Sequence, residues 1–224
     1  MIFLDLLFPR VCPVCGRLLL RREKYLCLSC LSDLPFSFFW SWPNNPAEVC
    51  FWGRLNIIRA SSLLIYREES PYKKIIHSFK YYGNRGLGKF LGEMFARRLL
   101  ESGLYTDIDL IIPVPLHPLK KWKRGYNQAS VLAKSIGRLL DKPVDESTLL
   151  RRKFTSTQTR KDAFHRWENV MDAFYLKNNS LIKGKHILLV DDVLTTGATL
   201  EACGQHILKQ EGCMLSIVTL AYVE

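Results

Sequence analysis

The stretch that most constrains this chain is "HILLVDDVLTTGATLEA", residues 186–202. It opens with Ile187–Val190, a continuous apolar run that is typical of a strand buried on both faces of a parallel sheet. Two acids, Asp191 and Asp192, end this strand, and small residues separate them from an apolar helical pattern that begins at Leu200. The stretch therefore predicts a strand, a loop and a helix, with the acids at the strand's carboxyl end. Open α/β sheets bind their ligands at such ends.

The composition of the loop favours an anionic ligand. A loop of small residues at the start of a helix exposes backbone N–H groups and the positive end of the helix dipole, which suits a phosphate. Two carboxylates beside it can accept hydrogen bonds from hydroxyls, such as those of a ribose. We therefore predict a sugar-phosphate site. Its residues are Asp191, Asp192, Thr195, Thr196, Gly197, Ala198 and Thr199.

Four other interpretations of this stretch are weaker. The phosphate loop of nucleotide hydrolases needs a lysine after its last glycine, and none follows Gly197. A dinucleotide-binding loop needs glycines spaced as GxGxxG, and the loop has only one. A signalling receiver domain begins with a similar strand, but only 32 residues follow Asp192. The acids could simply cap the next helix, although a cap needs one acid and no Thr-Thr-Gly loop.

The residues "LLVDDVLTTGATL" resemble the ribose-phosphate signature of type I phosphoribosyltransferases. The resemblance implies that Asp191 and Asp192 bind the ribose hydroxyls of phosphoribosyl pyrophosphate (PRPP). It also implies that the amides of residues 195–199 hold the 5′-phosphate of that ligand.

Four of the seven cysteines form two CxxC pairs near the start of the chain. Such pairs can place four thiolates tetrahedrally around one zinc ion and so stabilise a segment too small to bury a core. Four thiolates leave no open position for a reacting water, so the zinc is expected to be structural. The alternative is a set of ordinary buried cysteines or disulfides. The predicted ligands are Cys12, Cys15, Cys27 and Cys30, whereas Cys50, Cys203 and Cys213 are expected to be packing residues.

The opening "MIFLDLLFPR" is apolar, but it lacks a basic region and carries Asp5, which argues against a signal peptide. No run approaches the roughly 20 apolar residues of a membrane-spanning helix. We therefore expect no membrane insertion and a cytoplasmic location, where thiols stay reduced.

The net charge of +11 is concentrated in residues 115–170, which hold thirteen basic and five acidic residues. Such a concentration favours an anionic partner, although a solvated basic face would look the same. Within it, "KKWKRGYNQ" interleaves basic and aromatic residues, a composition that can bind single-stranded nucleic acid by phosphate contacts and base stacking. In the alternative interpretation, the two aromatic rings pack on the domain and the charges serve a pyrophosphate. The nucleic-acid candidates are Lys120, Lys121, Trp122, Lys123 and Tyr126.

The remaining pattern alternates strands and helices, which predicts an α/β fold with a parallel sheet and helices on both faces. Ser70 and Asn127 are expected to cap two of the helices, and residues 41–49 are expected to form a linker or turn. We predict a zinc-binding module and linker over residues 1–56 and a second domain over residues 57–224. The predicted strands are 60–66, 108–115, 172–176, 186–190 and 215–223.

Ordered sequence blocks extend the resemblance to about residues 8–222. They are "IPVPLHP", "RGYNQA", "RRKFTSTQT", "RWENVMDAF" and "VDDVLTTGATL", and they resemble the competence protein ComF family. Members of that family couple a cysteine-rich zinc module to a phosphoribosyltransferase-like domain. Many also carry a second cysteine pair before that domain, where this chain has only Cys50.

The resemblance implies a role in natural transformation, with single-stranded DNA and other competence proteins such as a helicase as partners. It implies PRPP as ligand, with Mg²⁺ carried in by it, and matches "PVPLHP" to the pyrophosphate loop. Positive charge and backbone donors are needed there to stabilise a leaving pyrophosphate. The candidates on this side are Val114, Pro115, Leu116, His117, Arg124 and Lys80.

Two classes of function remain open at this stage. One is a PRPP-binding module that works in DNA uptake. The other is a true phosphoribosyltransferase of nucleotide metabolism or salvage, either amidophosphoribosyltransferase-like or directed at a base. No segment identifies an acceptor, so no catalytic residue is assigned.

Overall fold

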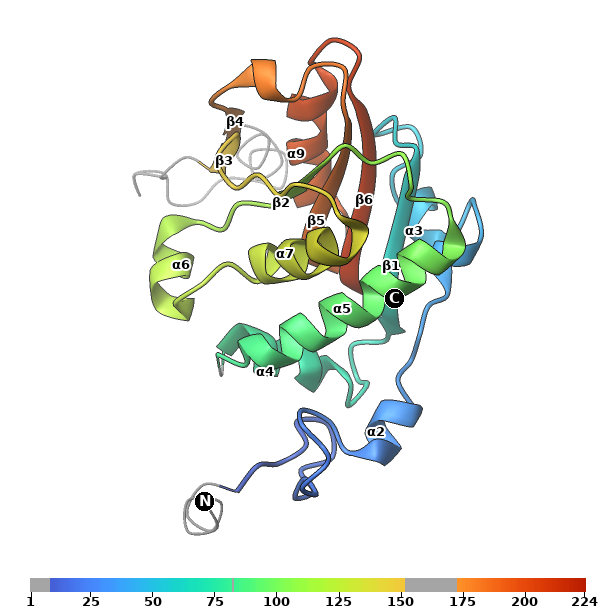
Figure 1. The fold of residues 1–224 in the computed structure, drawn as a ribbon, viewed down its shortest axis with the longest axis vertical. Helices are drawn as coiled ribbons and strands as arrows, with labels where there is room; N and C mark the ends of the chain where they lie inside the picture. The colour runs from blue at the N-terminus through green and yellow to red at the C-terminus, as the bar shows by residue number, and fades with distance from the viewer. Residues whose placement is uncertain (1–8, 82, 152–172) are drawn as a thin grey trace.

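The computed structural model describes residues 9–81, 83–151 and 173–224 (Figure 1). The blocks "RRKFTSTQT" and "RWENVMDAF" lie outside the described residues except for Arg151, Ala173 and Phe174.

A four-stranded sheet with the order β1-β6-β5-β2 forms the centre of the fold (Figure 1). Every neighbouring pair in it is parallel, so the carboxyl ends of all the strands meet at one edge. The paired acids of the third strand in this order and the turn after Pro113 therefore lie at the same edge. The strands are β1 (Arg59–Tyr66), β2 (Leu110–Pro113), β5 (His186–Leu194) and β6 (Met214–Val223).

Helices cover both faces of this sheet because its central strands are apolar on both sides. In β5, Leu188 and Val190 belong to one core with α5 (Arg85–Ser102) and α7 (Gln128–Leu140). Ile187 and Leu189 belong to a second core with α9 (Ala198–Leu208). Burial of each such side chain contributes about 1.5–3 kcal/mol. The predicted fold class is confirmed.

Several local predictions differ from the structure. The strand predicted over 186–190 extends to Leu194, so Asp191 and Asp192 lie within β5. A strand is present near residues 172–176 as β4 (Phe174–Leu176), but it pairs antiparallel with β3 (Leu149–Arg151) in a separate two-stranded sheet. Apolar alternation predicts a strand without specifying its partner, which explains this difference. The helix expected from Ser70 is α4 (Lys73–Tyr81), and Ser70 Oγ accepts a hydrogen bond from the Tyr72 amide in the preceding turn, at 3.3 Å.

Residues 41–49 are not a free linker. They include the end of η1 (Phe39–Ser41) and all of α3 (Pro46–Val49), which Asn45 caps through hydrogen bonds from the Ala47 and Glu48 amides. The same Asn45 is fully buried and donates to the carbonyl of Ala60 at 2.9 Å, in β1. Asn and Pro predict a turn locally, but here their contacts anchor the segment to the sheet. The domain boundary at residue 56 stays a prediction.

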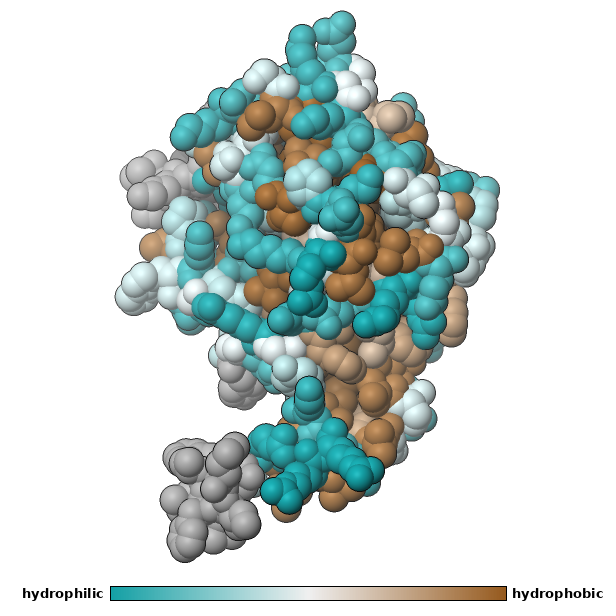
Figure 2. Space-filling view, in the orientation of Figure 1, coloured by the Kyte–Doolittle hydropathy of each residue, from teal (hydrophilic) through white to brown (hydrophobic). Residues whose placement is uncertain are grey.

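The amino-terminal module, which contains α2 (Leu28–Ser32), lies at one end of the molecule against α4 and α5 (Figure 1). The Lys74 ammonium donates to the carbonyl of Val14 at 3.2 Å, and the rings of Tyr25 and Phe90 lie 5.7 Å apart. Hydrophobic side chains also gather between α5 and the chain that leads from α2 to α3 (Figure 2). Among the helices in the described ranges, none has the length and apolar content to cross a membrane.

Candidate functional site

A cavity of about 290 Å³ lies at the carboxyl edge of the sheet, beside the ends of β2 and β5. It brings together residues from α4, β3, β5 and the short helix α6 (Pro118–Arg124), which are far apart in the sequence. Its lining is Lys80, Val114, Pro115, Leu116, Lys120, Arg124, Asn127, Gln128, Arg151, Asp191, Asp192, Val193, Thr195 and Thr199.

The two acids of β5 have different environments in this cavity. Asp192 Oδ1 lies 3.0 Å from the Lys80 ammonium, whereas Asp191 Oδ1 accepts a hydrogen bond from the Asp192 amide at 2.8 Å. Burial, followed by the negative charge of Asp192, raises the pKa of Asp191 to about 7, although Lys80 and Arg151 oppose the shift. Asp191 is therefore about half protonated at neutral pH in the free site, and such perturbed carboxyl groups are typical of functional sites.

The loop after the acids leads into α9 through Gly197, whose φ is 75°. Glycine adopts this left-handed conformation without the steric cost that a Cβ imposes. Within the described part of the chain, no side chain caps the amino terminus of α9. Its first amides are therefore available to a ligand, as a phosphate site requires.

Four cationic side chains line the cavity, those of Lys80, Lys120, Arg124 and Arg151. Besides Lys80, Arg124 donates to Gln128 Oε1 at 3.1 Å, and its guanidinium lies 5.3 Å from the centre of the Tyr81 ring. Arg151, at the end of β3, lies 5.1 Å from the ring of Phe174, and its pKa is lowered by burial.

Sequence reasoning missed Arg151 as a site residue and gave Asn127 only the role of a cap. Arg151 opens the block "RRKFTSTQT", to which no role was assigned. Asn127 does cap α7, accepting from the Ala129 amide at 3.2 Å, but its Nδ2 also donates to the carbonyl of Val114 at 2.9 Å. It thereby ties the turn after β2 to the helix behind it.

The basic stretch 120–126 divides between the surface and the interior. Trp122 is 86% exposed, and the side chains of Lys120, Lys121 and Lys123 are also exposed. Tyr126 is only 7% exposed, and its hydroxyl donates to the carbonyl of Phe79. Of the two aromatic candidates for base stacking, only Trp122 presents its ring to solvent.

His117, a pyrophosphate-side candidate, begins α6 and does not line the cavity described above. Its Nδ1 accepts a hydrogen bond from the Leu119 amide at 3.2 Å. Burial lowers its pKa, and the positive charges of Arg151 and Lys120 act in the same direction. A neutral imidazole suits this capping role, because only an unprotonated nitrogen can accept.

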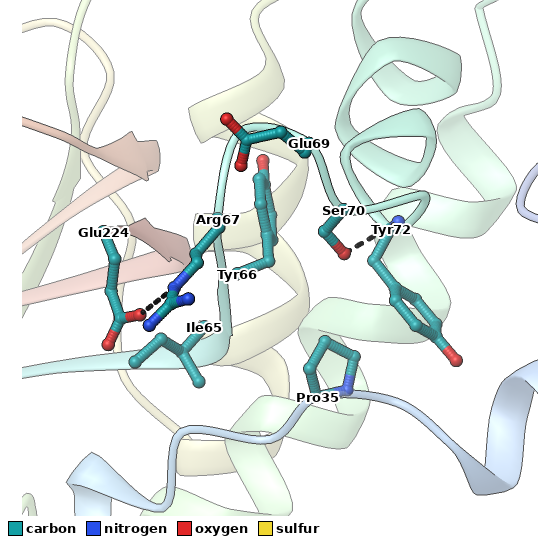
Figure 3. A pocket seen from close by; sticks show the side chains of 8 residues that line it. All are labelled: Pro35, Ile65, Tyr66, Arg67, Glu69, Ser70, Tyr72 and Glu224. Atoms are coloured by element: carbon teal, nitrogen blue, oxygen red, sulfur yellow. Dashed lines mark hydrogen bonds and ion pairs between the residues drawn. The ribbon is translucent and has the colours of Figure 1, made fainter.

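A second and larger cavity, of about 610 Å³, lies beside the ends of β1 and β6 (Figure 3). Among the described residues that line it, Arg67 pairs with Glu224 at 3.4 Å, and Glu69 adds a further negative charge (Figure 3). Such a lining does not suit a phosphate ester. The charge of the lining therefore favours the smaller cavity as the ligand site.

The four CxxC cysteines come together in the amino-terminal module. The sulfur atoms of Cys12, Cys15, Cys27 and Cys30 all lie within 4.8 Å of one another, and those of Cys15 and Cys27 lie 3.7 Å apart. Tetrahedral Zn–S bonds of about 2.3 Å place sulfurs roughly 3.8 Å apart, so the cluster fits a zinc ion.

Zinc requires the thiolate form, which backbone donors favour at Cys12, whereas burial and the neighbouring cysteines raise the pKa of Cys30. Burial raises the pKa of Cys12, but hydrogen bonds from backbone amides, first that of Cys27, outweigh it and lower the pKa to about 7. The Cys30 amide donates to the sulfur of Cys27 at 3.4 Å. The predicted structural zinc site is thus consistent with both the positions and the chemistry of its ligands.

Comparisons with known proteins match both parts of the chain. Residues 3–38 match the double zinc ribbon domain family, and residues 126–224 match the phosphoribosyl transferase domain family. The zinc ribbon match contains one four-cysteine cluster.

Three curated relatives illustrate the similarity. DNA utilization protein YhgH of Escherichia coli (strain K12) is 27% identical over 215 residues, covering 92% of this chain and 88% of the relative. Competence protein ComFC of Bacillus subtilis (strain 168) is 27% identical over 205 residues, covering 86% and 81%. Competence protein F of Haemophilus influenzae is 34% identical over 134 residues, covering 58% of each chain.

Solved structures are more distant. Adenine phosphoribosyltransferase from Saccharomyces cerevisiae aligns with a TM-score of 0.41 at 17% identity, covering 63% of this chain and 72% of that one. Glutamine PRPP amidotransferase from B. subtilis aligns with a TM-score of 0.40 at 17% identity, covering 58% and 25%.

Together, the parallel sheet, the paired acids near the carboxyl end of β5 and the family matches define a phosphoribosyltransferase-type domain preceded by a four-cysteine zinc module. Relatives of the chain are named DNA utilization protein and competence protein. The chain is similar to such relatives over as much as 92% of its length, in agreement with the resemblance to the ComF family that its sequence blocks predicted.

Proposed function

We propose that this protein binds PRPP and acts in DNA uptake, in association with single-stranded DNA. The observation that supports PRPP most directly is the composition of the 290 Å³ cavity, which joins two carboxylates, an uncapped helix start and four cations. The names of its relatives, which refer to competence and DNA utilization, support the biological role.

Each part of PRPP has a counterpart in the cavity. Asp191 and Asp192 would accept hydrogen bonds from the ribose hydroxyls, and the amides of residues 195–199 would hold the 5′-phosphate. The pyrophosphate would lie against the turn 114–117, near Lys80 and Arg124. We add Arg151, whose position in the lining suits the same group. Mg²⁺ would enter with PRPP, because this ion binds phosphate oxygens while keeping part of its water shell.

The basic surface of α6 lies beside this cavity and is the proposed contact for single-stranded DNA. Lys120 lines the cavity, whereas Lys121, Trp122 and Lys123 lie outside its lining. The proposed setting is the cytoplasm, with other competence proteins such as a helicase as partners.

A true phosphoribosyltransferase is the second proposed function. The cationic side of the cavity favours it, since positive charge would stabilise a departing pyrophosphate. Incubation of the protein with PRPP, Mg²⁺ and candidate acceptors, including bases, ammonia and single-stranded DNA, separates the two proposals. Pyrophosphate release above the acceptor-free rate supports turnover, and its absence across this panel supports the binding role.

Calorimetry and thermal unfolding with PRPP and Mg²⁺ test the binding proposal. Ligand at 100 times its Kd should add about 2.7 kcal/mol of stability, equivalent to a Tm rise of roughly 5–10 °C. Combined Asp191→Asn and Asp192→Asn changes should abolish that rise without unfolding the protein. The matched control is Asp141→Asn with Glu211→Gln, two exposed acids elsewhere. Unchanged PRPP affinity in the Asp191/Asp192 variant would show that the ribose assignment is wrong.

A further inference from the structure

The loop proposed to hold the 5′-phosphate is contacted from behind by a segment more than 140 positions earlier in the chain. Arg54 Nη1 donates to the carbonyl of Thr196 at 2.8 Å and to that of Cys50 at 3.1 Å. Arg54 Nε donates to Glu201 Oε2 at 3.0 Å, and its Nη2 bonds the same oxygen. One guanidinium thus joins this upstream segment, the loop and the first turn of α9.

Packing adds to these polar contacts. A Cβ at Gly197 would lie 2.9 Å from the ring of Phe51, which is fully buried, and 3.2 Å from the sulfur of Cys50. The sulfur of Cys50 also lies 3.9 Å from the carbonyl oxygen of Thr195. Three consecutive loop residues, 195–197, therefore lie against the segment 50–54, and their backbone has little room to move away from the cavity.

The charge of Glu201 makes the ion pair important for an anionic ligand. Glu201 lies in the first turn of α9, and its side chain is only 6% exposed. A carboxylate there occupies the favourable positive end of the helix dipole and would repel a phosphate that approaches the same amides. Arg54 supplies the opposite charge directly to this carboxylate. Its loss would leave a buried, uncompensated negative charge beside the phosphate loop.

We propose that Arg54 is a positioning residue for the 5′-phosphate loop. It would fix the backbone through Thr196 and neutralise Glu201 without touching the ligand. This inference rests on the proposed PRPP function. Arg54 lies outside both family matches, 3–38 and 126–224, so the chain between the two matched parts completes the binding loop.

Calorimetry with three ligands tests this role, namely PRPP, ribose 5-phosphate and inorganic pyrophosphate, each with Mg²⁺. Arg54→Met should weaken the two ligands that carry a 5′-phosphate by tenfold or more and change pyrophosphate affinity less than twofold. Arg54→Lys keeps the positive charge but lacks the planar guanidinium, so its loss of affinity for these two ligands should be smaller than that of Arg54→Met. Adding Glu201→Gln to Arg54→Met should recover part of the affinity, because the uncompensated charge is removed.

The control variant is Arg138→Met. Like Arg54, Arg138 forms an ion pair with a glutamate, here Glu93 of α5, but it lies outside the cavity and the phosphate loop. This variant should leave the affinities for all three ligands unchanged. An equal loss of pyrophosphate affinity in Arg54→Met, or no loss for any ligand, would overturn the positioning role.

Hydrogen exchange of the ligand-free protein separates this inference from the PRPP proposal. Arg54→Met should raise the exchange rates of amides 195–199 at least tenfold, while the rates of the β1 amides stay unchanged. Arg54→Lys should give loop exchange rates between those of the parent and of Arg54→Met. If the parent protein fails to bind PRPP, the proposed function fails, and the loop-positioning role is still decided by this measurement. Unchanged exchange in the loop would refute it.

Discussion

At the scale of one residue, Asp191 illustrates how the proposed binding site is held at a cost in stability. Its neighbour Asp192 has the Lys80 ammonium at 3.0 Å, whereas Asp191 is half-buried beside the charge of Asp192, and its pKa rises to about 7. A carboxyl in this position is unfavourable when ionised, and the hydroxyl groups of the proposed ligand would donate hydrogen bonds to it. Such placements concentrate at functional sites.

The raised pKa of Asp191 predicts a pH-dependent stability. Unfolding releases the carboxyl to an ordinary pKa near 3.8, so between about pH 4 and 7 the folded state binds more protons. Stability from this group is therefore lost as pH rises through that window. Asp191→Asn should raise the Tm at pH 8 relative to the parent. The rise should be roughly 2–4 °C for each kcal/mol of unfavourable free energy that the ionised carboxyl contributes, and the effect at pH 4 should be small. Thermal unfolding across this range measures the difference.

Glu211→Gln is the control for that experiment, because this carboxyl is exposed and lies outside the cavity. Its Tm should follow that of the parent at every pH. An Asp191→Asn variant less stable than the parent at pH 8 would contradict the placement of Asp191 in an unfavourable, half-buried position.

Individual elements were predictable where their signals are local. The apolar run, acids and small-residue loop of 187–199 specify β5, the turn at Gly197 and the start of α9, and all three are present. By contrast, Arg151 and the contact of Arg54 with the loop were not predicted, because they depend on contacts between distant segments that no periodicity encodes. The partner of β4 and the anchoring of residues 41–49 to the sheet were missed for the same reason, since short polar or apolar runs do not specify what they pack against.

The amino-terminal module is the element whose stability depends most on its metal. We expect about one zinc ion per chain, and Cys27→Ser should release it, because a three-thiolate site binds zinc more weakly. The module should then unfold first. The sheet domain should persist with a modest loss of about 1 kcal/mol, since contacts such as that between Tyr25 and Phe90 disappear.

Metal analysis and thiol alkylation check this prediction, and Cys213→Ser is the matched control. Cys213 lies outside the cysteine cluster, so its loss should leave the zinc content unchanged. Parent protein that contains no zinc, with Cys12, Cys15, Cys27 and Cys30 all freely alkylated, would refute the structural zinc site.

At the scale of the whole molecule, positive charge and the ligand cavity adjoin each other. The net charge is +11, and most of the excess lies in residues 115–170. In the part of this segment that the structure describes, Lys120, Lys121 and Lys123 lie on α6, at the cavity. Because Lys121 and Lys123 lie outside the lining, a DNA strand that follows them need not displace PRPP. We therefore expect PRPP and single-stranded DNA to bind together, and saturating PRPP to leave most DNA affinity intact.

Binding of single-stranded DNA should fall with salt at a log-log slope of about −0.7 for each phosphate neutralised. Lys121→Ala with Lys123→Ala should lower the affinity for DNA and flatten that slope by roughly 1.4. The control pair, Lys183→Ala with Lys209→Ala, removes the same charge from exposed lysines elsewhere and should change neither the affinity nor the slope.

Trp122→Ala should cost about 1–3 kcal/mol of binding free energy at every salt concentration with the slope unchanged, because stacking releases no counterions. Fluorescence anisotropy over a salt series measures all of these changes. Equal effects of the two lysine pairs would reduce the interaction to net charge alone, and absence of binding at low salt would remove DNA as a direct partner.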